Sequence, residues 1–225
     1  MDPRLRSAVD ASVGWYDDLC TLHGVGSMLV DGLWSALGTP PPLHSDAVVV
    51  EPEVTADRVL ARLDGRARCG VKDSFATIDL SREGMELLFS ATWIHHDAGR
   101  HRKRRPPAGW VAVTGAAELA EWTGRHDTGD VLLPPLLERA HFRFLARYAD
   151  ERIVAGAVAR LGSGTVDVSN VYAVPGHRVD WAELAEVVGS VFPDRPLVGY
   201  ERGEALTAAL AGGFAPVGEL RVWFR

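Results

Sequence analysis

The chain has 225 residues, of which 47% are hydrophobic and 24% are charged, which is an ordinary composition for a globular protein. This length allows one large domain or two smaller ones, and either can bury a hydrophobic core. The formal net charge of -6 argues against nucleic acid as a partner of the whole protein.

Two cysteines, Cys20 and Cys69, lie far apart and outside any CxxC or Cys/His ligand spacing, so we expect no zinc site from them. Their small number fits a reduced, cytoplasmic setting. No apolar run reaches the length of a membrane span, and the amphipathic N-terminal segment lacks the pattern of a signal peptide. We therefore expect no membrane partner.

The first half of the sequence alternates between helix and strand patterns. Apolar residues at helical spacing predict a helix over residues 3–21, and a glycine-rich turn leads to a second short helix ending near Leu37. Strands are then predicted over residues 47–52, 70–79 and 85–94, with a helix over residues 55–63 that begins at the N-cap Thr55.

Residues 98–108 are polar and basic and include two prolines, which is typical of a linker or long loop. They divide the chain into an N-terminal region of helices and strands, residues 1–97, and a C-terminal region, residues 109–225. The C-terminal region opens with a strand, two short helices and a strand, predicted over residues 110–115, 116–124, 132–140 and 141–148.

The last third has the clearest pattern. Two strands, residues 153–161 and 165–174, are joined by a Gly-Ser-Gly turn, and Pro175-Gly176 ends the second one. A helix follows over residues 180–192 with Asp180 as its N-cap, then a strand over 196–201, a small-residue helix over 204–214 and a final strand.

This order, with a hairpin that leads through a Pro-Gly turn into a helix, resembles the GNAT acetyltransferase superfamily. The segment that carries the resemblance is Asn170-Val171-Tyr172-Ala173-Val174-Pro175-Gly176-His177-Arg178, and Ala208-Ala209-Leu210-Ala211-Gly212-Gly213-Phe214 is similar to the family's later helix, which ends in Gly-Phe. The resemblance implies an α/β (α+β) fold with a mixed, mostly antiparallel sheet flanked by helices. It also leaves open whether residues 1–97 are a degenerate second GNAT-like half.

The resemblance implies acetyl-CoA as cofactor, with its pyrophosphate at the turn and at the start of the following helix, where backbone N–H groups and the helix dipole favour anions. The pantetheine arm then pairs with the main chain of the preceding strand. The positions implied to bind the cofactor are Val171, Tyr172, Ala173, Val174, Gly176, His177 and Arg178.

Several residues depart from the family's pattern. Trp181 and Glu183 stand where the family has small residues, and Asp180 places a negative charge where a pyrophosphate is expected. Ala209 stands where the family often has a tyrosine that acts as general acid. A catalytically inactive GNAT-like module that binds a ligand or a protein is therefore the alternative to an active enzyme.

Three polar residues are candidates for catalysis. Tyr200 and Glu201 end a predicted central strand, where ligands of α/β sheets collect, so that Glu201 is a candidate general base and Tyr200 a candidate general acid. Asn170 lies on the strand before the turn, where a polar side chain can face a substrate. An exposed Glu201 that caps the next helix and a Tyr200 at the edge of the core are the structural alternatives.

Two other clusters are weaker candidates. His95, His96 and Asp97, with His101, suggest a metal site, but adjacent strand residues point to opposite faces, so we expect no metal. The basic run over residues 100–105 is interpreted as a solvated loop.

The sequence thus predicts an acyl-CoA-dependent N-acyltransferase that moves an acetyl group to a primary amine of a small molecule or a protein. The oligomeric state stays open, a homodimer included.

Overall fold

A computed structural model describes residues 1–97, 107 and 109–225. The chain forms two compact units: unit 1 comprises Met1–Trp93 and Val217–Arg225, and unit 2 comprises Ile94–Pro216. Two strands run from one unit into the other along the chain, β5 (Glu86–His96) and β11 (Ala215–Phe224). Unit 2 therefore begins before the basic segment, of which residues 98–106 and 108 lie outside the described residues.

Unit 1 is a sheet with two α-helices. Its strands have the order β1-β2-β3-β4-β11-β5, with β3 and β4 parallel. Besides β5 and β11, its elements are α1 (Pro3–Leu22), β1 (Ser27–Val30), β2 (Leu33–Ala36), β3 (Ala47–Val49), α2 (Ala56–Arg62), β4 (Gly70–Asp73) and the 3-10 helix η1 (Ser81–Glu83).

The N-terminal helix is confirmed, and the prediction of a second helix is wrong. Asp2 caps α1 by accepting a hydrogen bond of 2.8 Å from the N–H of Arg4. The second segment is instead the hairpin of β1 and β2, which turns at Asp31 and Gly32 with φ of 48° and 80°. Because Asp-Gly with two positive φ values is a favoured hairpin turn, this dipeptide was the local signal for strands.

The core of unit 1 includes a buried lysine. Lys72 is 1% exposed, and its Nζ lies 2.8 Å from Oγ of Ser12 and 4.6 Å from the ring centroid of Trp93. A buried ammonium needs hydrogen-bond acceptors or an aromatic face to offset the loss of water. Ser12 and Trp93 supply one of each.

The strands β10-β9-β8-β7-β6 follow one another in this order in the sheet of unit 2, to which the end of β5 (Ile94–His96) also belongs. The pair β9–β10 is parallel and the other three pairs are antiparallel, which confirms the mixed, mostly antiparallel sheet. Its elements are β6 (Trp110–Val113), α3 (Ala116–Gly124), the 3-10 helix η2 (Pro134–Glu138), β7 (Phe142–Ala149), β8 (Arg152–Leu161), β9 (Val166–Ala173), α4 (Trp181–Val191), β10 (Leu197–Glu201) and α5 (Gly203–Ala211).

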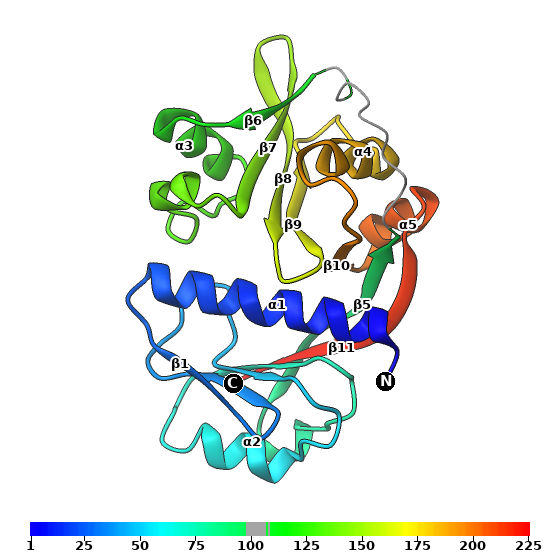
Figure 1. The fold of residues 1–225 in the computed structure, drawn as a ribbon. Helices are drawn as coiled ribbons and strands as arrows, with labels where there is room; N and C mark the ends of the chain where they lie inside the picture. The colour runs from blue at the N-terminus through cyan, green and yellow to red at the C-terminus, as the bar shows by residue number, and fades with distance from the viewer. Residues whose placement is uncertain (98–106, 108) are drawn as a thin grey trace. The chain divides into compact units, whose positions relative to one another are not determined.

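Helices lie on both faces of this sheet, with α3 on one side and α4 on the other (Figure 1). Alternate residues of β8 and β9, such as Ala155, Ala157, Val166 and Val168, pack with α4 and α5 in one hydrophobic cluster. The alternation follows from the period of two in a strand. No helix among the described residues is long and apolar enough to cross a membrane.

The face toward α3 is closed by an aromatic cluster around Gly156. Trp122 donates from Nε1 to the carbonyl of Leu145 at 2.9 Å, and the hydroxyl of Tyr172 donates to the carbonyl of Trp122 at 3.1 Å. His126 stacks on Tyr172 with ring centroids 4.8 Å apart. A Cβ on Gly156 would overlap the Trp122 indole and lie 2.5 Å from Cε1 of Tyr172.

We expect Gly156→Ala to lower the free energy of unfolding by about 1–3 kcal/mol, because the added methyl group forces one of the two rings to move. Gly164→Ala is the matched control, since a Cβ there meets no atom within 4 Å. Urea unfolding of both variants measures the difference. Equal stability of the two variants would show that the cluster is loosely packed.

Candidate functional site

The strands β9 and β10 pair only at their beginnings. The recorded pairs are Leu197 with Val166 and Val198 with Asp167, although β9 continues to Ala173 and β10 to Glu201. A Cβ on Gly199 would lie 2.6 Å from the carbonyl oxygen of Val168, so the two strands are still in contact at this position. Beyond it no pair between β9 and β10 is recorded among the described residues, and we call this unpaired end of the two strands the opening.

Asn170 marks the start of this opening on β9. Its φ is 51°, in the left-handed region, which asparagine tolerates better than most residues. The register with β8 shifts here: Val158 pairs with Ser169, whereas Gly156 pairs with Tyr172. The strand therefore has a β-bulge, a feature that bends a strand and increases its twist. The Nδ2 of Asn170 donates to Oγ of Ser169 at 3.2 Å.

The turn after β9 is exposed and well defined. The N–H of His177 donates to the carbonyl of Val174 at 3.0 Å, and Gly176 has a φ of 85°. Proline followed by a residue with positive φ is typical of a type II turn. Pro175, Gly176, His177 and Arg178 are all exposed.

The first turn of α4 is capped by the protein's own carboxylate. Oδ1 of Asp180 accepts hydrogen bonds from the N–H groups of Ala182 and Glu183 at 2.9 and 3.0 Å. These amides are among the donors that a bound phosphate group would use at a helix N-terminus. Asp180 is thus confirmed as the N-cap. It occupies the same N–H groups that the predicted cofactor site would use to bind the pyrophosphate.

Trp181 turns away from the exposed turn. It is 3% exposed and packs edge-on against Phe214 with ring centroids 5.2 Å apart. A Cβ on Gly212 would lie 2.5 Å from Cβ of Trp181, so the end of α5 contacts the start of α4. The indole is thus part of the core and does not cover residues 175–178. Ala209 is also fully buried, at 0% exposure.

The structure places the proposed acid and base on opposite faces of β10, because Tyr200 and Glu201 are adjacent residues of one strand. Glu201 shares a face of β10 with Leu197, which packs in the cluster under α4. Tyr200 points to the opposite face and is 38% exposed. Burial raises the pKa of Glu201 from its ordinary 4.5 to about 7, although the N–H and the positive charge of Arg202 act in the opposite direction. Glu201 therefore keeps its proton to a higher pH than an ordinary glutamate.

The predicted cofactor residues divide between the strand and the turn. Tyr172 directs its side chain to α3, so that only its main chain borders the opening. The N–H of Val174 donates to the carbonyl of Val154 at 2.9 Å and is already used. Within the described residues, the amides of Gly176 and Arg178 have no backbone acceptor.

The histidines of β5 are not arranged as a metal site. Nδ1 of His95 lies 3.5 Å from Oδ1 of Asp97, whereas His96 packs against Phe214 with ring centroids 5.1 Å apart. No group of three metal-ligating side chains is found among the described residues. His101 and the rest of the basic run, residues 100–105, lie outside them.

The sequence pattern alone did not reveal the close approaches of Gly199 to β9 and of Gly212 to α4. These contacts depend on residues that are distant in the sequence. The bulge at Asn170 had a local signal, since asparagine is depleted in strands and enriched at positive φ.

Solved structures with the same fold can now be compared. A GCN5-related N-acetyltransferase from Kribbella flavida has a TM-score of 0.63 at 15% identity, covering 96% of this chain and 95% of its own. A functionally unknown conserved protein from Staphylococcus epidermidis has a TM-score of 0.66 at 12% identity, covering 89% and 94%. A GCN5-related N-acetyltransferase-like protein from Streptococcus suis has a TM-score of 0.54 at 12% identity and covers 100% of both chains.

No family model and no curated protein matches the sequence. At 12–15% identity the likeness establishes the fold, and the chain has the GNAT fold that the sequence predicted. Because the matches cover nearly the whole of each chain, both units belong to the shared architecture.

Asp180→Ala should lower the free energy of unfolding by about 1 kcal/mol, because the amides of Ala182 and Glu183 lose their acceptor. Asp180→Asn should change it much less, since asparagine is an equally good N-cap. Urea unfolding measures both. An unchanged free energy of unfolding in Asp180→Ala would show that the cap does not stabilise α4.

Glu201 should make stability depend on pH. Because its pKa is raised in the folded state, the folded protein holds a proton that the unfolded chain releases. The free energy of unfolding then falls as the pH rises from 4.5 to about 7, by about 1.4 kcal/mol for each pH unit in which only the folded state is protonated.

Glu201→Gln removes this contribution, so the difference in stability between the variant and the wild type should grow in favour of the variant from pH 4.5 to 7. Thermal unfolding across this range measures the effect. Parallel pH curves for the two proteins would mean that the carboxyl group titrates normally.

Proposed function

We propose that the protein is an acyl-CoA-dependent N-acyltransferase that acetylates a primary amine. The observation that carries the proposal is the ending of the β9–β10 pairing just before the Asn170 bulge, with the half-buried Glu201 at the end of β10. The GNAT fold supports it. The acceptor is a small-molecule or protein amine of unspecified structure.

The main chain of Val171, Tyr172 and Ala173 borders the opening beyond the recorded β9–β10 pairs. An extended amide chain such as pantetheine can hydrogen-bond to a strand edge of this kind. A bound acyl-CoA supplies an activated thioester carbonyl to the amine. The protein contributes the relative position of the two reactants, which is a large part of the rate enhancement in transfer reactions.

Glu201 is the proposed general base. A primary ammonium must lose a proton before its nitrogen can attack, and a carboxylate with a pKa of about 7 accepts that proton far more readily than an ordinary glutamate. The amine then attacks as a neutral nucleophile. As the new C–N bond forms, the C–S bond of the thioester breaks and CoA leaves as a thiolate, for which Tyr200 stays the proposed general acid. Asn170 stays a proposed contact of the substrate.

The phosphate end of the donor has fewer partners than the resemblance implies. The amides of Ala182 and Glu183 are bonded to Asp180, so phosphate contacts fall to the amides of Gly176 and Arg178 and to the Arg178 guanidinium. An arginine and free amides can hold a phosphate oxygen. The carboxylate of Asp180 weakens this binding by repulsion.

The capped helix is also the observation that favours a second candidate function. A GNAT-like module that has lost the acyl-CoA site would keep the fold and use Asp180 only to stabilise α4. Its ligand would then be another small molecule or a protein. The binding of acetyl-CoA distinguishes the two functions.

Titration calorimetry with acetyl-CoA should give saturable binding that Asp180→Asn tightens about two- to fivefold, because the variant keeps the cap and removes the opposing charge. Arg178→Ala should weaken binding, since it removes a charged partner of the phosphate groups. Absence of binding to both the wild type and Asp180→Asn would favour the non-enzymatic module.

Turnover is then measured as release of free thiol from acetyl-CoA in the presence of a panel of primary amines. The protein's own Cys20 and Cys69 are buried at 0% exposure and give little background with a thiol reagent. Glu201→Gln should bind acetyl-CoA as the wild type does and lose most of its turnover near pH 7. Unchanged turnover would remove Glu201 from the mechanism.

A further inference from the structure

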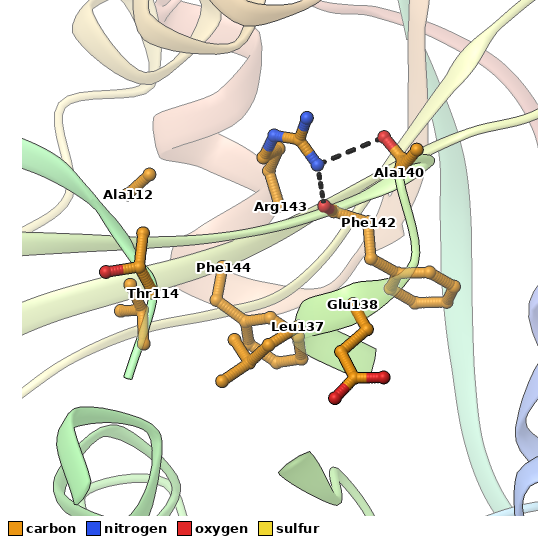
Figure 2. Close-up of a pocket in the computed structure, with 9 residues that line it drawn as sticks. Ala112, Thr114, Leu137, Glu138, Ala140, Phe142, Arg143 and Phe144 are labelled. Atoms are coloured by element: carbon orange, nitrogen blue, oxygen red, sulfur yellow. Dashed lines mark hydrogen bonds between the residues drawn. The ribbon is translucent and has the colours of Figure 1, made fainter. Parts of the chain in front are cut away.

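A cavity of about 380 Å³ lies in unit 2 where β6 ends, η2 crosses and β7 begins (Figure 2). Small and apolar side chains make most of its wall, and Arg143 and Glu138 are its charged members. The volume is in the range of small-molecule sites, which are mostly apolar with a few placed polar groups.

Arg143 is held in place from two sides. Its Nη1 donates to the carbonyls of Phe142 and Ala140 at 2.6 and 3.0 Å, and its guanidinium lies 5.9 Å from the ring centroid of Phe192. Figure 2 shows both hydrogen bonds. These contacts use one nitrogen of the guanidinium and leave its other N–H groups for a ligand.

The positive charge of Arg143 is not paired within the protein. No ion pair joins it to an acidic side chain anywhere in the described part of the chain. Glu138 lines the same cavity but is exposed, and in Figure 2 its carboxylate points away from Arg143. An arginine that is fixed by carbonyls and lacks a carboxylate partner is suited to an external carboxylate, which can bind it through two parallel hydrogen bonds.

The walls of the cavity are preformed. Ala112 and Val113 of β6 pair with Leu145 and Phe144 of β7, which fixes the two strands against each other. η2 begins with two prolines, which restrict its backbone. A ligand therefore finds the site already built and loses less affinity to ordering the protein.

This cavity is separate from the opening used in the proposed function. β8 lies between β7 and β9 in the sheet, so the cavity at β6 and β7 is on the far side of β8 from the β9–β10 opening. The cavity is therefore independent of the acyl-transfer proposal.

We propose that this cavity binds a small monocarboxylate with an apolar body, its carboxylate on Arg143 and its body against Ala112, which lies on the same face of the sheet as Arg143. A single arginine neutralises one negative charge, and the nearby Glu138 repels a second one. Most of the residues that line the cavity are small or apolar, which favours a hydrocarbon body over a fully polar anion.

Titration calorimetry with isovalerate tests the proposal, with isovaleramide as the neutral ligand of the same shape and inorganic phosphate as a polar anion. Isovalerate should bind the wild type, and isovaleramide should bind at least about tenfold more weakly because it lacks the charge that strengthens the hydrogen bonds to Arg143. Phosphate should also bind at least about tenfold more weakly, because Glu138 repels its second charge and it has no apolar body. Equal binding of isovalerate and its amide, tighter binding of phosphate, or no binding of isovalerate would overturn it.

Arg143→Gln should lose at least about tenfold in isovalerate affinity, whereas Arg147→Gln should not. Arg147 is the matched control because it lies on the same strand, is also half-buried and does not line the cavity. Ala112→Phe keeps Arg143 and fills part of the cavity, so it should also lose binding, and it serves as the second variant if Arg143→Gln does not fold. Retained affinity in a folded Arg143→Gln or in Ala112→Phe would place the ligand elsewhere.

Discussion

The proposed site of unit 2 depends on the left-handed backbone of Asn170. Before this residue, β9 is paired on both sides, to β8 and to β10. After it, β9 keeps its pairing with β8 at a shifted register and has no recorded pair with β10. One residue with φ of 51° thus lies where the recorded parallel pairing has ended, at a β-bulge of the kind that bends a strand. The functional interpretation proposed for the exposed turn at residues 175–178 and for the half-buried Glu201 depends on this end of the pairing.

The same region shows a conflict between stability and binding. A helix that begins at the end of a sheet strand can bind an anion through its free amides, or it can satisfy them with a capping side chain. In α4 the amides of Ala182 and Glu183 are satisfied by Asp180, which stabilises the helix and disfavours a second anion. The proposed binding of acyl-CoA is therefore expected to be weaker than at an uncapped helix, with a larger share of the contacts made by Arg178.

The sequence predicted the fold well where its signals are local. The strands, the Pro-Gly turn and the capped helix of the last third are all present, because alternation, turn residues and an Asp N-cap act over a few neighbouring residues. The prediction of a helix before Leu37 is wrong because Asp31-Gly32, with positive φ at both residues, turns the chain into a hairpin. The candidate site was less predictable: the contact of Gly212 with α4, and the burial that raises the pKa of Glu201, come from residues that only the folded chain brings together.

The path of β11 has a consequence for biosynthesis. In unit 1 this strand lies between β4 and β5, and the backbone groups of Arg225 and Cys69 hydrogen-bond to each other in both directions. The strand that completes the first unit is thus made only after the whole of unit 2. During translation, β4 and β5 lack the strand that lies between them until all of Ile94–Pro216 has been made. Unit 2 is therefore the part of this protein that can fold first, although it comes second in the sequence.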